Sequence, residues 1–199
     1  DMFLEEKHEV FEDLLTHYRE EAVALISHNF EDAKPLLSAM AMEGLPMPRL
    51  YRALGAIALN RRLVELLRKL EPDPTRLTAS EDLEELLMEA ELMGYKLESG
   101  EGGQILARIL ERHLWDLKES FQTETATRLH QFLLLVRRIP ITLEETEPQN
   151  FIFALMKERF PAVAASAGTD PKARNLADLL LKVLEALNFS PVRYLRLLG

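Results

Sequence analysis

One amphipathic helical pattern follows another along almost the whole chain, from Phe3 to Leu198, and no alternating strand pattern interrupts the series. Apolar residues recur at three- and four-residue spacings, as on one face of a helix. The composition is rich in Leu, Ala, Glu and Arg, which are good helix formers. We therefore expect an all-α fold of about eight amphipathic helices in an antiparallel, bundle-like arrangement.

Short connections separate the predicted helices, which favours antiparallel neighbours. The predicted helices cover residues 3–27, 30–42, 48–70, 80–93, 104–121, 124–139, 148 onward and 172–187, with a terminal turn through 198. The helix pairs share no residues at fixed offsets, so nothing supports a repeat architecture. We expect one domain over residues 1–199, in which residues 1–29 form a long N-terminal helix and residues 30–199 carry the other helices.

The first predicted helix has an apolar seam. Its members recur at heptad spacing and are Leu4, Phe11, Leu15, Tyr18, Ala22 and Leu25. This spacing places all of them on one side of the helix. We expect that side to pack against a neighbouring element.

Several residues predict where helices begin and end. Gly44, Gly94 and Asn188 stand at positions where a C-terminal cap is expected. Ser80 lies in a short run of residues that favour an N-terminal cap. These four positions therefore mark expected helix ends.

Two stretches rich in glycine or proline predict loops. Gly100 and Gly102-Gly103 predict a turn before the helix at 104–121, without the lysine, the hydroxyl and the preceding strand of a phosphate-binding loop. Pro161, Gly168 and Pro171 bracket an alanine-rich stretch that we expect to be irregular.

The chain is acidic, with a net charge of −9 and no cysteine. A nucleic-acid-binding protein normally presents a basic stripe, whereas the basic pairs here, such as Arg61-Arg62 and Arg137-Arg138, lie on predicted helices or at their ends.

No apolar stretch approaches the roughly 20 residues of a membrane span. The N-terminal residues turn charged too soon for a signal peptide. We expect no nucleic-acid or membrane partner and a cytoplasmic location.

No cluster of catalytic or metal-binding residue types has the sequence spacing of a known catalytic or metal-binding motif. The best candidate is Glu5 with His8, whose Glu-x-x-His spacing occurs twice in di-iron carboxylate bundles. No other histidine of this chain has a glutamate three residues before it. His113 and His130 lie on adjacent predicted helices without a zinc-like spacing. We predict no catalytic residue, metal site or cofactor, and keep a metal-dependent bundle enzyme only as a remote alternative.

Four residues are candidates for contact with a partner or a second domain, namely Asn60, Trp115, Gln149 and Asn150. Asparagine is a poor helix former, yet Asn60 and Asn150 lie within or at the start of apolar helices. We therefore expect each to bond either a neighbouring helix end or a partner domain. Trp115, the only tryptophan, is expected to pack between helices, and the alternatives are that it stacks on a sugar or anchors an interface.

Three blocks of sequence occur in a recognisable order. They are Ala33-Lys34-Pro35-Leu36-Leu37, Gly44-Leu45-Pro46-Met47-Pro48 and Ala58-Leu59-Asn60, then residues 83–97 ending in Met93-Gly94-Tyr95-Lys96-Leu97, then Ile139-Pro140-Ile141 with Pro148-Gln149-Asn150-Phe151. This succession resembles the C-terminal helical domain of unknown function found in family 57 glycoside hydrolase-like proteins of the α-amylase and α-mannosidase type. The resemblance covers residues 30–188. At the positions of residues 143–150, family members tend to carry alternating aromatic residues that lead to a Gln-Asn pair. The acidic residues at 144–147 of this chain depart from that pattern.

The resemblance implies a helical accessory domain without catalysis of its own. In such proteins the two carboxylates of a retaining mechanism lie in an N-terminal (β/α) barrel, and nothing in this chain corresponds to that barrel. Because Asp1 precedes Met2, we expect a fragment whose first helix leads from an upstream barrel. The expected partners are that barrel, in the same polypeptide, and further copies of the chain. The alternative is a stand-alone helical module that binds a protein partner through an exposed apolar surface.

Overall fold

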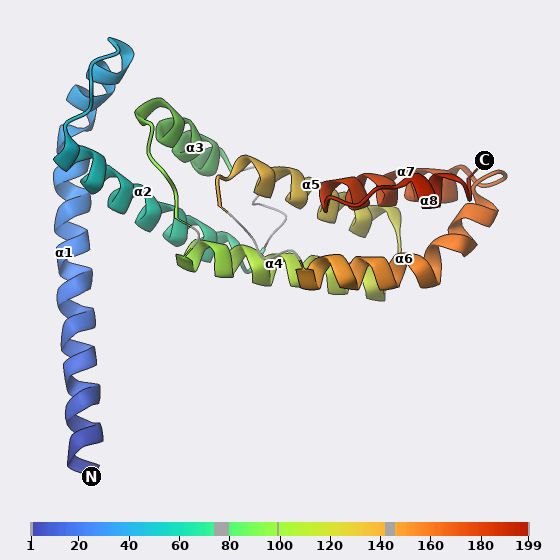
Figure 1. Cartoon of the computed structure of the whole chain (residues 1–199), viewed down its shortest axis with the longest axis horizontal. Coiled ribbons are helices and arrows are strands. Elements are labelled where there is room, and N and C mark those ends of the chain that lie inside the picture. The colour runs from blue at the N-terminus through green and yellow to red at the C-terminus, as the bar shows by residue number, and fades with distance from the viewer. Residues whose placement is uncertain (1, 74–79, 99, 142–145, 199) are drawn as a thin grey trace. The chain divides into compact units, whose positions relative to one another are not determined.

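The computed structural model describes residues 2–73, 80–98, 100–141 and 146–198. Over these ranges the chain forms helices and no strand, so the all-α prediction is confirmed (Figure 1). The helices are α1 (Met2–Met42), α2 (Arg49–Leu70), α3 (Glu81–Met93), α4 (Gly100–Glu119), α5 (Thr123–Arg138), α6 (Thr146–Ser166), α7 (Pro171–Ala186) and α8 (Val192–Leu195).

The first helix is continuous where the sequence predicts two helices. The expected break between Ser27 and Phe30 is wrong, because α1 runs through both residues and no proline or glycine stands between them. Pro35 lies inside α1 and removes one helical hydrogen bond. The side chains of Phe30 and Leu37, on either side of Pro35, are fully buried. Their burial stabilises the helix across the proline.

Two predicted loops are helical. α4 begins at Gly100, so the loop expected at Gly100 and Gly102-Gly103 is wrong, and Gly102 and Gly103 are buried. α6 continues through Pro161 to Ser166, so the irregular stretch expected there begins too early. Helix propensity is a local preference that tertiary burial overrides. Phe160, directly before the proline, is fully buried and supplies such burial.

Helix ends follow the sequence prediction closely. Gly44, Gly94 and Asn188 adopt positive φ angles of 67°, 66° and 62°. In each case the next backbone N–H donates to the carbonyl five residues before it, as Tyr95 does to Ala90 at 2.9 Å, which is the Schellman motif. The Ser80 hydroxyl accepts from the Leu83 amide at 3.3 Å at the start of α3.

The chain divides into two compact units, and the division runs through α2 and α3. Unit 1 comprises Asp1–Leu63 and Glu84–Leu97, and unit 2 comprises Val64–Leu83 and Glu98–Gly199. The expectation that residues 1–199 act as one domain stays a prediction.

A buried carboxylate joins the three helices of unit 1. Glu89 of α3 is 8% exposed, and its Oε2 accepts from Lys34 Nζ of α1 at 2.7 Å and from Arg62 Nη1 of α2 at 3.1 Å. Both cationic side chains stay partly in contact with water. Charge-assisted bonds of this kind are stronger than neutral ones, so Glu89 fixes α1 and α2 to α3.

A close approach between α2 and the end of α3 completes unit 1. The ring of Tyr95 lies 5.8 Å from that of Phe30, and its hydroxyl donates to the Tyr51 carbonyl at 3.4 Å. A Cβ at Gly55 would stand 2.3 Å from Tyr95 Cζ. Glycine at position 55 therefore lets the buried tyrosine lie against the backbone of α2.

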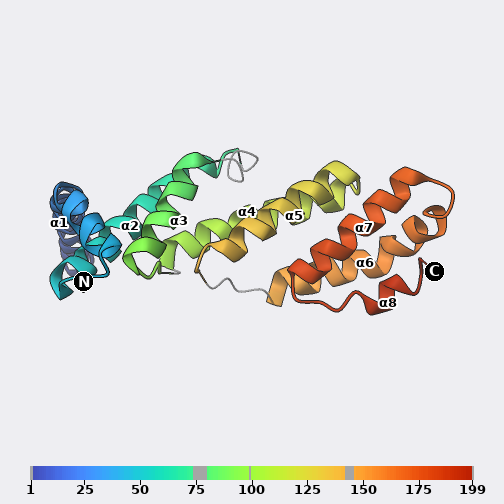
Figure 2. The ribbon, with the colours of Figure 1, turned by 90° about the horizontal axis from the view of Figure 1, so that it is seen from above.

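Unit 2 has an apolar core built by four helices. α5 packs against α4 and α7, and α6 packs against α7 and α4 (Figure 2). The fully buried side chains come from all four helices and include Ile105, Leu106, Leu129, Phe132, Ile152, Phe160, Leu180 and Leu184. α8 adds Tyr194, whose ring meets that of Phe160 at 5.3 Å.

The Glu89 contacts generate a stability prediction. Glu89→Gln removes the charge that holds Lys34 and Arg62, and we expect it to lower the free energy of unfolding by about 1–3 kcal/mol. Glu85→Gln is the matched control, because Glu85 also faces Arg62 but is exposed, and we expect a change within about 0.5 kcal/mol. Urea unfolding followed by circular dichroism measures both. Equal losses in the two variants would show that the buried bonds contribute no more than the exposed pair.

Candidate functional site

The N-terminal half of α1 carries large apolar side chains in contact with solvent. Six of them are 46–69% exposed, namely Val10, Phe11, Leu14, Leu15, Tyr18 and Leu25, which we call the α1 face. At about 100° per residue these positions and Ala22 fall within an arc of about 140°. The α1 face is therefore one continuous apolar stripe.

The prediction that this seam packs against a neighbouring element of the chain is wrong for its described members. Phe11, Leu15, Tyr18 and Leu25 are all exposed, and Figure 1 shows this stretch of α1 without α2 or α3 beside it. Isolated exposed apolar residues are ordinary, whereas contiguous ones mark sites of interaction. The α1 face is therefore a candidate interaction surface.

The surroundings of the α1 face are acidic. Residues 1–30 contain eight Asp and Glu residues and only two Lys and Arg residues. Its histidines lie beside carboxylates one turn further on, with His8 Nε2 3.3 Å from Glu12 and His17 Nε2 3.3 Å from Glu21. Both pairs are highly exposed, and acidic residues outnumber basic ones by six over residues 1–30.

Two of the four predicted contact residues form bonds inside the protein. The Asn60 amide donates to the Ala56 carbonyl at 2.8 Å and to the Lys96 carbonyl at 3.4 Å, which ties α2 to the segment after α3. The Gln149 amide donates to the Leu187 carbonyl at 3.0 Å, at the end of α7. Their contact with a partner stays a prediction.

The other two predicted residues lie at the surface of unit 2, on α4 and α6. Trp115 is 53% exposed and Asn150 is exposed. The Trp115 ring lies 5.8 Å from that of Phe151, which follows Asn150. The structure thus brings Trp115 against Phe151 of α6, whereas Asn60 belongs to unit 1.

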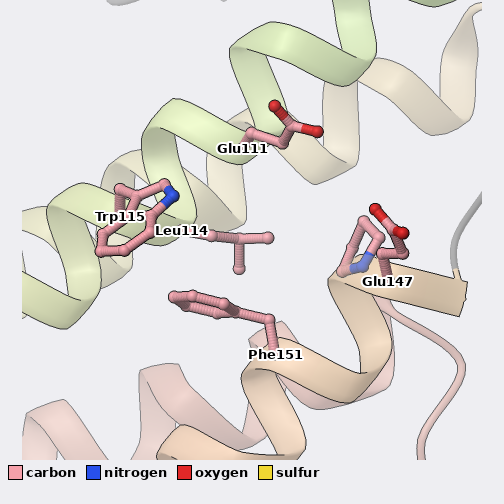
Figure 3. Close-up of a pocket in the computed structure, with 6 residues that line it drawn as sticks. Glu111, Leu114, Trp115, Glu147 and Phe151 are labelled. Atoms are coloured by element: carbon pink, nitrogen blue, oxygen red, sulfur yellow. The ribbon is translucent and has the colours of Figure 1, made fainter.

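A pocket of about 180 Å³ lies between α4 and α6. Its lining residues are Glu111, Leu114, Trp115, Glu147, Pro148 and Phe151 (Figure 3). Trp115 and Phe151 form an aromatic wall, Leu114 closes the space between them, and the two glutamates come from facing helices. Sequence reasoning singled out only Trp115. The four-residue spacings 111–115 and 147–151 place each glutamate on the same helix side as an aromatic ring, and this signal was available.

A cation lies on the aromatic wall of the pocket. Lys118 Nζ is 4.5 Å from the centroid of the Trp115 ring and 5.9 Å from that of Phe151, although Lys118 does not line the pocket. Ammonium groups are attracted to aromatic faces by the ring quadrupole. The wall therefore already attracts positive charge.

A wider groove of about 820 Å³ lies between the start of α5, the end of α6 and the start of α7. One of its polar groups serves a helix start, because Asp170 accepts from the Lys172 amide at 2.9 Å at the beginning of α7. The lining also includes the polar side chains of Gln122, Glu124 and Asn175.

His113 of α4 is a buried titratable group of unit 2. It is 5% exposed, its ring lies 5.1 Å from that of Phe132, and its Nε2 has no hydrogen-bond partner among the described residues. Burial lowers the pKa of His113, with a further lowering from Arg128 and Arg112 and an opposing effect of Asp116. The imidazole is therefore neutral at pH 7 and acts as part of the core.

No group of three metal-ligating side chains comes together within the described part of the chain. The side chain of Glu5 lies outside that part, while His8 pairs with Glu12. None of the helices described is long and apolar enough to cross a membrane.

Comparison with known proteins gives no relative. No family model, no curated protein and no solved structure matches the chain. The resemblance to the helical domain of family 57-like proteins therefore stays a prediction from sequence.

The buried imidazole of His113 generates a prediction for pH dependence. Its folded pKa lies below its ordinary value of about 6.5, so the unfolded chain takes up the proton first as the pH falls. The contribution of His113 to the free energy of unfolding is therefore constant above about pH 6.5. As the pH drops further, this contribution decreases by at most about 1.4 kcal/mol per pH unit.

The variant His113→Leu stays neutral, and we expect its stability to fall less between pH 7 and pH 5. His17→Gln on exposed α1 is the control and should keep the slope of the unmodified chain. Urea unfolding at several pH values gives the slopes. A His113→Leu slope as steep as the original would contradict this account.

Proposed function

We propose that this chain is a non-catalytic helical accessory domain of an amylase-like glycoside hydrolase, and that it docks onto the catalytic (β/α) barrel through the α1 face. The observation that carries the proposal is the exposed apolar stripe from Val10 to Leu25. The sequence resemblance supplies the class of enzyme. No residue of this chain is assigned to catalysis.

The size of the α1 face supports docking. Fully burying one large apolar side chain contributes roughly 1.5–3 kcal/mol, whereas association costs an estimated 4–15 kcal/mol. One exposed residue is therefore insufficient, and six such residues together reach the range of that cost. Tyr18 and Phe11 are also of the aromatic type that is enriched at interfaces.

The charge around the α1 face specifies its partner. A second copy would bring two acidic helices together, which is repulsive. A partner surface with an apolar stripe and basic flanks is complementary to residues 1–30. We therefore assign the α1 face to the catalytic domain rather than to a homodimer.

The alternative is a stand-alone helical module that binds a separate protein through the same α1 face. The same exposed stripe favours it. Reading the complete open reading frame separates the two. The accessory proposal expects several hundred codons of barrel sequence upstream, and an open reading frame without barrel sequence would exclude it.

The docking proposal is tested by binding in trans. The catalytic region and this chain are produced separately, and fluorescence anisotropy measures the dissociation constant of their complex. We expect Leu15→Glu with Tyr18→Glu to weaken binding at least about thirtyfold, because two central apolar contacts become charged. Thr16→Glu is the control, since Thr16 is exposed and lies on the opposite side of α1 at about 100° per residue, and we expect less than a threefold change.

Two outcomes would overturn the docking proposal. One is a complex that tolerates Leu15→Glu with Tyr18→Glu, since the α1 face would then lie outside the interface. The other is self-association of the isolated chain that the same substitutions abolish, because the occupant of the face would then be a second copy.

A further inference from the structure

The pocket between α4 and α6 is large enough for one side chain or one small head group. Its volume is about 180 Å³, whereas pockets for drug-sized ligands measure roughly 300–1,000 Å³. It therefore admits a side chain or a head group and excludes a whole oligosaccharide. The pocket lies in unit 2, and its occupancy does not depend on the α1 face.

The polar groups of the pocket are almost all acceptors. Glu111 and Glu147 contribute carboxylates, and among the described lining residues the indole N–H of Trp115 is the one side-chain donor. Both glutamates are exposed, and none of the described lining residues is Lys, Arg or His. A ligand that fits must supply donors and positive charge.

The aromatic wall selects for a flat cation. Trp115 and Phe151 lie 5.8 Å apart with their planes at 57°, and Lys118 already approaches both rings. A guanidinium group is planar, stacks on aromatic faces, carries five donors and no acceptor, and pairs with carboxylates through two parallel bonds. An ammonium group meets the charge requirement without the stacking or the paired bonds.

We propose that this pocket binds the side chain of an arginine from a partner polypeptide. The guanidinium replaces the Lys118 ammonium on the Trp115 ring and donates to Glu111 and Glu147, while Leu114 and Pro148 contact its aliphatic stem. A neutral sugar fits less well, because its hydroxyl groups need donors as well as acceptors and the pocket offers mainly acceptors.

Trp115 makes the test specific to the pocket. It is the only tryptophan of the chain, so its fluorescence reports binding at this wall alone. The unmodified chain is titrated with Nα-acetyl-L-argininamide, and we expect a saturable change with a dissociation constant on the order of 1–10 mM, as for one small group. Nα-acetyl-L-citrullinamide, a neutral molecule of nearly the same shape, should give no saturation, and the lysine analogue should bind more weakly than the arginine one.

Substitutions separate the pocket carboxylates from the general charge of the protein. Glu111→Gln with Glu147→Gln should weaken binding of Nα-acetyl-L-argininamide at least about threefold, since two exposed ion pairs are lost. Glu124→Gln with Asp178→Asn removes the same charge from exposed positions outside this pocket, and binding should be unchanged. Circular dichroism establishes that both variants keep the helical fold.

Three results would overturn the proposal. The first is an equal response to the arginine and citrulline amides, or no response to either. The second is equal weakening by the two pairs of substitutions, which would indicate attraction to the overall negative charge. The third is tighter binding of maltotriose than of the arginine amide, which would make the pocket a sugar subsite.

Discussion

The buried carboxylate of Glu89 is the interaction on which the arrangement of unit 1 depends. Lys34 of α1 and Arg62 of α2 both donate to the same oxygen of Glu89, so one side chain of α3 holds two other helices. Phe30 and Leu37 of α1 are fully buried close to Lys34 in sequence. The described side chains of residues 10–25 include no such anchor, and the large apolar ones of the α1 face meet solvent. The part of α1 that bonds Glu89 is therefore packed against α2 and α3, and the part that carries the α1 face is exposed to solvent.

Unit 2 is stabilised differently, because its four long helices share an apolar core. The buried imidazole of His113 lies against Phe132. At the surface of this core, Trp115 and Phe151 leave an aromatic wall between two carboxylates. The two candidate surfaces therefore differ in chemistry: the α1 face offers apolar area within an acidic helix, and the pocket of unit 2 offers one aromatic, acceptor-rich receptor. Neither surface needs a catalytic residue.

The sequence predicted those features that depend on neighbouring residues. The caps at Gly44, Gly94 and Asn188 follow from local backbone preferences, and the structure has a positive φ at each. The helical Gly102-Gly103 was missed, because its burial depends on residues distant in sequence. The pocket was missed except for Trp115 for the same reason. Its halves lie about 36 residues apart, and only the packing of α4 against α6 brings Glu111 to face Glu147.

The central claim is that the α1 face is a docking surface, and hydrogen–deuterium exchange tests it most directly. The measurement compares the backbone amides of residues 10–25 in the isolated chain and in the full-length gene product. A helical segment without tertiary packing is marginally stable, so these amides should exchange rapidly in the isolated chain. The account predicts exchange at least about tenfold slower in the full-length product, because docking buries the α1 face. Equal exchange of residues 10–25 in the two proteins would contradict it.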